Sequence, residues 1–212
     1  MTLRYTLLSD GSSDRVLMPI ISWLLQAHGV GFELRGVWAD LRSLRQPPTT
    51  LSGKVLRALE FYPCELLFVH RDAEGATSAQ RRREIGQALN EIGHGEEVPV
   101  VSVIPVRMQE AWLLLDESAI RKAAGNPRGR VLLNLPAPNR IEDVPGPKEM
   151  LYRALRMASE QTGRRLRKLH VSYLRYRVVE LIEDFSPLRT LPAFVEFENE
   201  LAAIVQRLRP PQ

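Results

Sequence analysis

The 212-residue chain contains one cysteine, Cys64, and no apolar run of about 18 residues, the least that a membrane-spanning helix requires. A single cysteine excludes an internal disulfide framework and a cysteine-rich zinc site. Residues 1–4 lead directly into a strand-like segment and do not resemble a signal peptide. We therefore expect a cytoplasmic protein with no membrane partner.

The sequence also lacks the short motifs that identify common nucleotide-binding and DNA-reading folds. It has no P-loop, no Gly-x-Gly-x-x-Gly and no zinc-finger spacing. Disorder is excluded as well, because 44% apolar and 25% charged residues are ordinary for a globular protein. The function must therefore be sought in the order of the structural elements and in the polar residues at their ends.

The first half of the chain alternates predicted strands and helices. Apolar segments predict strands at 3–9, 32–37, 66–69 and 98–106, and helices such as 51–61 and 78–92 lie between them. This order is typical of an α/β fold with a mostly parallel central sheet and helices on both faces. From residue 108 onward the pattern is mostly helical. We divide the chain into an α/β core, 1–140, and a helical C-terminal extension packed on it, 141–212.

Acidic side chains follow three of the predicted strands. Asp10 and Asp14 follow the first strand, Asp72 and Glu74 the third, and Glu110 the fourth. The carboxyl ends of neighbouring parallel strands meet in one crevice, so we expect these acids to converge. Clustered carboxylates require a cation, and oxygen ligands favour Mg²⁺ or Mn²⁺. We predict metal ligation by Asp10, Asp72, Glu74 and Glu110, although each acid alone is also explained as a turn, capping or surface residue.

Several segments resemble a known family. Residues 10–14, Asp-Gly-Ser-Ser-Asp, resemble the Glu-Gly loop of the Toprim fold, and the acids after 66–69 are placed like its Asp-x-Asp motif. Residues 107–116, Arg-Met-Gln-Glu-Ala-Trp-Leu-Leu-Leu-Asp, are similar to the Glu-Ala-Trp-Leu-x-x-Asp segment of a large bacterial Toprim-like family of unknown function, and 147–149 and 184–194 look like its helical tail. The resemblance implies a core related to the nuclease domain of overcoming-lysogenization-defect proteins. It also implies an ABC-type ATPase as partner in anti-phage defence.

Two positions depart from the Toprim pattern. Asp10 stands where Glu is usual, and His70 stands where the first Asp of Asp-x-Asp is expected. If the motif aligns with His70 and Asp72, an imidazole replaces an oxygen ligand, which suits manganese or zinc better than magnesium. If Asp72 and Glu74 serve instead, the acidic pair is shifted by two residues. His70 could also act as a general acid or base, or simply bond to the backbone at the strand end.

Basic residues lie at the strand ends and in the C-terminal half. Arg71 and Arg107 either pair with nearby acids or clamp a phosphate. Residues 153–177 carry eight of the 29 Lys and Arg residues against one acid, with tyrosines among them. This pattern is found in surfaces that bind a nucleic-acid backbone, in surfaces that meet an acidic protein, and in solvated helix faces. The predicted nucleic-acid contacts are Arg153, Arg156, Arg164, Arg165, Arg167, Lys168 and Arg175.

These features together predict a metal-dependent phosphodiesterase, a nuclease acting on DNA or RNA. In this hypothesis Asp10, His70, Arg71 and Arg107 are catalytic, and the four acids hold Mg²⁺ or Mn²⁺. The alternative is a non-catalytic subunit that senses nucleic acid or regulates a partner ATPase on which it docks. Phosphoryl chemistry on a small molecule at the same crevice is a third option.

Overall fold

The computed structural model describes residues 2–29, 31, 33–94 and 97–208, and it divides into two compact units. The first unit comprises Met1–Ile104 and Glu196–Gln212, and the second comprises Pro105–Val195. The boundary predicted near residue 140 lies inside the second unit. No helix among the described residues is long and apolar enough to span a membrane.

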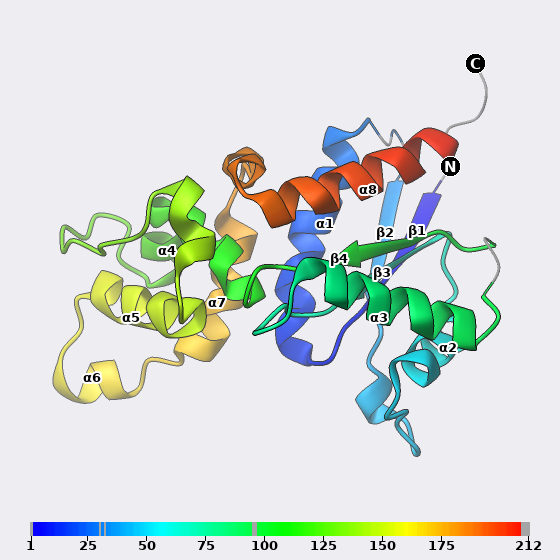
Figure 1. Cartoon of the computed structure of the whole chain (residues 1–212). Coiled ribbons are helices and arrows are strands. Elements are labelled where there is room, and N and C mark those ends of the chain that lie inside the picture. The colour runs from blue at the N-terminus through cyan, green and yellow to red at the C-terminus, as the bar shows by residue number, and fades with distance from the viewer. Residues whose placement is uncertain (1, 30, 32, 95–96, 209–212) are drawn as a thin grey trace. The chain divides into compact units, whose positions relative to one another are not determined.

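The first unit is built on a four-stranded parallel sheet with the order β2-β1-β3-β4 (Figure 1). The strands are β1 (Thr2–Leu8), β2 (Glu33–Trp38), β3 (Leu66–His70) and β4 (Val100–Val103). Every residue of β3 is buried, as its continuous apolar run predicts for a central parallel strand. The predicted α/β fold is thus confirmed. Phe32, the predicted start of the second strand, lies outside the described residues.

Helices cover both faces of this sheet. On one face Leu8 and Val69 pack with Val55 of α2 (Leu51–Phe61) and Ile85 of α3 (Ser78–Glu91). Side chains alternate along a strand, so the neighbouring residues face the other side. There the hydroxyl of Tyr5 bonds to Ser22 of α1 (Leu17–Ala27), and the Phe68 ring packs edge-on against Phe197 of α8 (Pro192–Leu208) at 6.2 Å.

Threonine caps fix where α2 and α3 begin. The hydroxyl of Thr50 accepts a hydrogen bond from the Gly53 backbone N–H at 3.1 Å, which starts α2. Thr77 and Gln80 form a reciprocal capping box at the start of α3. Each helix consequently begins at the carboxyl edge of the sheet, directly after the loop that follows the preceding strand.

The second unit is mostly helical, as predicted. Its elements are the 3-10 helices η3 (Gln109–Leu115), η4 (Pro138–Asp143) and η5 (Ser186–Thr190) and the helices α4 (Glu117–Ala123), α5 (Pro147–Ser159), α6 (Gly163–Arg167) and α7 (Val171–Leu181). Trp112 is fully buried and packs edge-on against Phe194 with 5.3 Å between ring centroids. The aromatic residue of the Glu-Ala-Trp-Leu segment is therefore a core residue of this unit.

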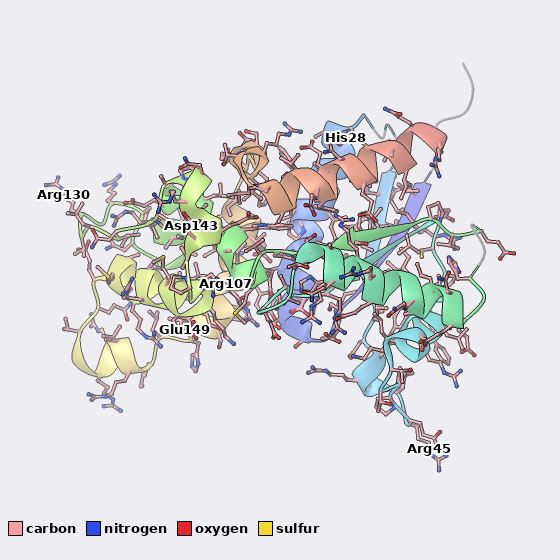
Figure 2. The ribbon with its side chains drawn as sticks, viewed as in Figure 1. His28, Arg45, Arg107, Arg130, Asp143 and Glu149 are labelled. Carbon is pink, nitrogen blue, oxygen red and sulfur yellow. The ribbon has the colours of Figure 1, made fainter. Side chains whose placement is uncertain are left out.

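The helix α5 ends at Ser159, because Glu160 adopts a left-handed conformation with φ of 51°. A carboxylate oxygen of Glu160 accepts backbone hydrogen bonds from Arg130 at 2.7 Å and Val131 at 3.2 Å. Figure 2 labels Arg130 in this loop, which connects α4 to η4. The bonds tie the loop to the end of α5 and offset the cost of the left-handed residue.

The packing of β2 against β1 generates a first prediction. A β-carbon at Gly36 would overlap the ring of Tyr5 and the terminal methyl of Met18. Tyr5 is 2% exposed, and its hydroxyl lies 2.6 Å from the Ser22 hydroxyl, so the ring cannot easily move away. We predict that Gly36→Ala lowers the free energy of unfolding by about 1–3 kcal/mol, measured by urea denaturation.

Gly86→Ala in α3 is the matched control. An added β-carbon there meets nothing within 4 Å, and alanine favours the helix, so this variant should gain about 0.5–1 kcal/mol. A Gly36→Ala protein as stable as the wild type would contradict the close approach of β2 to Tyr5.

The anchored end of α5 predicts a dependence of stability on pH. The backbone N–H groups of Val131 and Arg130 hold the pKa of Glu160 below its usual range. A lowered folded-state pKa stabilises the fold above the unfolded value, about 4.3, and this stabilisation is lost as pH falls through the folded value. Glu160→Gln keeps an acceptor oxygen but cannot titrate. We predict that the melting temperature of the wild type exceeds that of Glu160→Gln at pH 7. This difference in melting temperature should disappear as pH falls below about 4.3. A difference in melting temperature that stays constant down to pH 3 would refute the stabilising role of the ionised Glu160 carboxylate.

Candidate active site

The loops after β1 and β3 enclose a pocket of about 230 Å³ at the carboxyl edge of the sheet. The two strands are hydrogen-bonded neighbours in parallel register, with Leu8 opposite Val69, so their loops emerge side by side. Three of the four predicted metal ligands line this pocket, and so do three of the four predicted catalytic residues, since Asp10 belongs to both sets. Its charged and titratable lining residues are Asp10, Asp14, Asp72, Glu74, His70, Arg42, Arg71 and Arg81.

Asp10 is ionised and held by basic side chains. Its Oδ1 lies 2.5 Å from Lys54 Nζ, its Oδ2 lies 3.7 Å from Arg71 Nη1, and its backbone carbonyl accepts a hydrogen bond from Arg42. Burial alone would raise the pKa of Asp10, but the hydrogen bond and charge of Lys54, with Arg71, lower it below its usual value. About half of the side chain is still exposed to solvent.

Asp14 closes the loop that carries Asp10. Its carboxylate accepts hydrogen bonds from the Gly11 backbone N–H and the Ser13 hydroxyl, each at 2.9 Å. The side chain is buried at the start of the 3-10 helix η1 (Ser12–Val16). Asp14 thus acts as the acid at a helix amino terminus, one of the interpretations that the sequence allows.

His70 is fully buried and is oriented by two neighbours. Its Nδ1 lies 3.0 Å from the Val103 carbonyl, which can only accept, so Nδ1 carries a proton and Nε2 faces Asp72 Oδ1 at 3.4 Å. Burial would lower the pKa of His70, but the hydrogen bond and charge of Asp72, with the charge of Asp14, raise it above its usual value. With Nδ1 bonded to the Val103 carbonyl and Nε2 facing the carboxylate, this arrangement makes His70 a partner of Asp72.

Arg71 and Arg81 continue the charge network across the pocket. Arg81 donates to the Asp72 carbonyl and to Glu84, both at 3.0 Å, and Arg71 Nη2 lies 3.6 Å from Glu84. Glu74 adopts a left-handed conformation, is mostly exposed, and lies 3.9 Å from Arg81. Acidic and basic groups therefore alternate around the cavity.

Sequence reasoning missed Lys54, Arg42 and Arg81. Lys54 and Arg81 each occupy the fourth position of a helix that follows a sheet strand, four residues after the capping threonine. In a parallel α/β sheet such positions lie at the carboxyl edge, beside the loops that bear Asp10 and Asp72. Basic residues in the first helical turn after a strand are thus the signal that could have found them. Arg42, in the short 3-10 helix η2 (Leu41–Ser43) after β2, offers no comparable signal.

Glu110 and Arg107 belong to the second unit. Glu110 is 1% exposed in η3, and its Oε1 lies 3.2 Å from Arg175 Nη1. Arg175 also donates to the hydroxyls of Tyr152 and Tyr176, both at 3.3 Å. Arg107, labelled in Figure 2, has a left-handed backbone two residues before the start of η3. A joint role of Glu110 and Arg107 with the acids of the first unit stays a prediction.

The predicted nucleic-acid contacts fall into two groups. Arg175 is buried in its ion pair with Glu110. The other six side chains are exposed on α5, on α6 and at the end of α6; they are Arg153, Arg156, Arg164, Arg165, Arg167 and Lys168. The exposed basic side chains of this region are therefore concentrated between residues 153 and 168.

The pocket contains oxygen donors suited to a divalent metal, and basic side chains pair with them in this structure. Asp10, Asp72 and Glu74 supply the oxygen ligands that Mg²⁺ and Mn²⁺ prefer. Within the described ranges, however, no group of three or more His, Cys, Asp or Glu side chains is placed to hold an ion. Lys54 and Arg71 hold the Asp10 carboxylate instead.

Comparisons with protein-family models, curated proteins and solved structures find no match to this chain. The resemblance to the Toprim-like family therefore stays a prediction from residues 10–14, 70–74 and 107–116. Function has to be argued from the pocket itself.

The burial of Arg175 predicts a structural effect. Arg175→Met would remove the guanidinium that pairs with the buried Glu110 carboxylate, and removing one member of a buried pair costs about 3–5 kcal/mol. We expect a clear loss of unfolding free energy by urea denaturation. Arg164→Met, at an exposed position of α6, should leave stability within about 0.5 kcal/mol of the wild type. Equal stability of the two variants would contradict the inward orientation of Arg175.

Proposed function

We propose that this protein is a metal-dependent phosphodiesterase that acts on DNA or RNA at the pocket of the first unit. The observation that carries the proposal is that Asp10, Asp72 and Glu74 line one cavity with Arg71 and Arg81. Phosphodiester cleavage uses both kinds of group, since carboxylates hold divalent cations and guanidinium groups bind phosphate oxygens. When bound, the cation would activate water and neutralise charge on the phosphoryl group.

The side chains of the pocket have distinct roles in this proposal. Asp10 and Asp72, on adjacent loops, would hold the cation, with Glu74 as a further ligand. Arg71 is a quarter exposed and lies between Asp10 and Glu84, so it can turn to a phosphate without leaving the pocket. His70 is a positioning residue, because its bond to the Val103 carbonyl aims Nε2 at Asp72 and orients that carboxylate.

The basic side chains of α5 and α6 support a polymeric substrate. Six exposed Lys and Arg residues between 153 and 168 provide a surface that binds phosphates without sequence preference. A small phosphorylated molecule would not need this surface. The support is therefore for nucleic acid as the substrate class.

A non-catalytic subunit is the second candidate, and the ion pairing of the pocket favours it. Asp10 has Lys54, Glu74 has Arg81 and Asp72 faces His70, so the network is electrostatically balanced without a metal. In this case the pocket would stabilise the two loops. The protein would then sense nucleic acid through its basic residues or dock on the predicted ATPase.

Cleavage assays test the first candidate. We predict that Asp10→Ala and Asp72→Ala reduce cleavage of single-stranded DNA or RNA in Mn²⁺ by on the order of 100-fold or more, because each removes a ligand of the proposed cation. Glu33→Ala, an exposed acid on β2 outside the pocket, is the control and should cleave like the wild type. Full activity of both pocket variants would refute the assignment.

Calorimetric titration with MnCl₂ separates the two candidates without an activity readout. Lys54 competes with a cation for the Asp10 carboxylate, so Lys54→Met should raise the affinity for Mn²⁺, and Asp10→Asn should abolish it. Absence of binding in both the wild type and Lys54→Met, together with no cleavage, would support the non-catalytic subunit.

A further inference from the structure

A second cavity of about 380 Å³ adjoins the charged pocket in the first unit. Asp10 and Arg42 line both cavities, so the two meet at the carboxyl end of β1. The chemistry of the second cavity is different, because Trp38, Pro47 and Pro48 contribute to its wall. Its volume lies within the range of about 300–1,000 Å³ that is usual for small-molecule sites.

Trp38 is held in one orientation at the end of β2. Its indole Nε1 donates to the Ser9 hydroxyl at 2.9 Å, and that hydroxyl donates to the Gly11 carbonyl at 3.1 Å. The guanidinium of Arg15 lies over the indole at 5.9 Å from the ring centroid. The ring is therefore anchored to the loop that carries Asp10, and a ligand that stacks on it loses little affinity to side-chain ordering.

The rim of the cavity is basic where it meets the charged pocket. Lys54 Nζ forms an ion pair with the Asp10 carboxylate, and Arg42 donates a hydrogen bond to the Asp10 backbone carbonyl. Two positively charged side chains therefore lie at the junction of the two cavities. A ligand that spans both cavities must combine an anionic group at this junction with a flat, largely apolar group beyond it. A nucleotide has this composition, with a phosphate at one end and a base with two π-faces at the other.

We propose that the cavity lined by Trp38, Pro47 and Pro48 binds the nucleobase of a nucleotide whose phosphate lies at the basic junction formed by Lys54 and Arg42. This inference rests on the proposed function and adds a base subsite to it. Stacking accepts every base, so the subsite distinguishes nucleotides from other phosphates but does not impose a sequence.

Calorimetry on the full chain tests the subsite with two ligands, adenosine 5′-monophosphate and ribose 5-phosphate. The nucleotide should bind about tenfold tighter or more than the sugar phosphate, which lacks the base. Trp38→Ala should remove this advantage by lowering the nucleotide affinity about tenfold while leaving the sugar phosphate affinity unchanged. Phe61→Ala is the control, because it removes an exposed aromatic ring at the end of α2 that lines neither cavity. It should bind both ligands like the wild type.

Trp38→Phe keeps the proposal testable if Trp38→Ala does not fold. The nucleotide should quench wild-type tryptophan fluorescence, and in Trp38→Phe the quenching should disappear while calorimetric binding persists. Unchanged quenching in Trp38→Phe would overturn the subsite. Equal affinity of the wild type for the two ligands would also overturn it but would leave the phosphate pocket intact. Failure of both ligands to bind would instead remove the phosphate recognition on which the proposed function depends.

Discussion

The parallel hydrogen bonding of β1 to β3 places the two acidic loops beside each other. With Leu8 opposite Val69, the chain leaves both strands at the same level of the sheet, and residues 9–14 emerge next to residues 70–74. The pairing is secured from both faces, because β3 is buried throughout and β1 packs through Tyr5, Leu7 and Leu8. Every contact of the pocket depends on this register, since parallel strands fix which loop ends converge.

Charge balance is the second constraint on the pocket. Carboxylates brought together in this way would repel one another, and the structure offsets the repulsion with Lys54, Arg71 and Arg81. The same balance serves both candidate functions. In a phosphodiesterase the basic groups would exchange their carboxylate partners for substrate phosphates, whereas in a non-catalytic subunit they would keep them. The two candidate functions thus share the same pocket geometry. They differ in whether a substrate displaces the ion pairs.

The neighbouring cavity lined by Trp38, Pro47 and Pro48 is relevant to the proposed substrate class. A purely structural ion-pair network has no need for an adjoining cavity with an anchored indole, whereas a nucleotide site uses both. The exposed basic residues of α5 and α6 point to the same class of ligand from another part of the chain. The cavity and the charge network support the proposal of a nucleotide ligand, and the basic surface supports the proposal that this nucleotide is part of a nucleic acid.

The sequence by itself determined the order of strands and helices and the acids at their ends. Residues 51–61 form the predicted helix, and 66–69 form the core of β3, because apolar spacing and threonine caps act within a few residues. Only the tertiary structure decided that Lys54 holds Asp10, that Trp38 anchors to Ser9 and that Arg175 turns inward to Glu110. These partners lie 29 to 65 residues apart in the chain, and such contacts depend on strand pairing and helix packing, which no local pattern encodes.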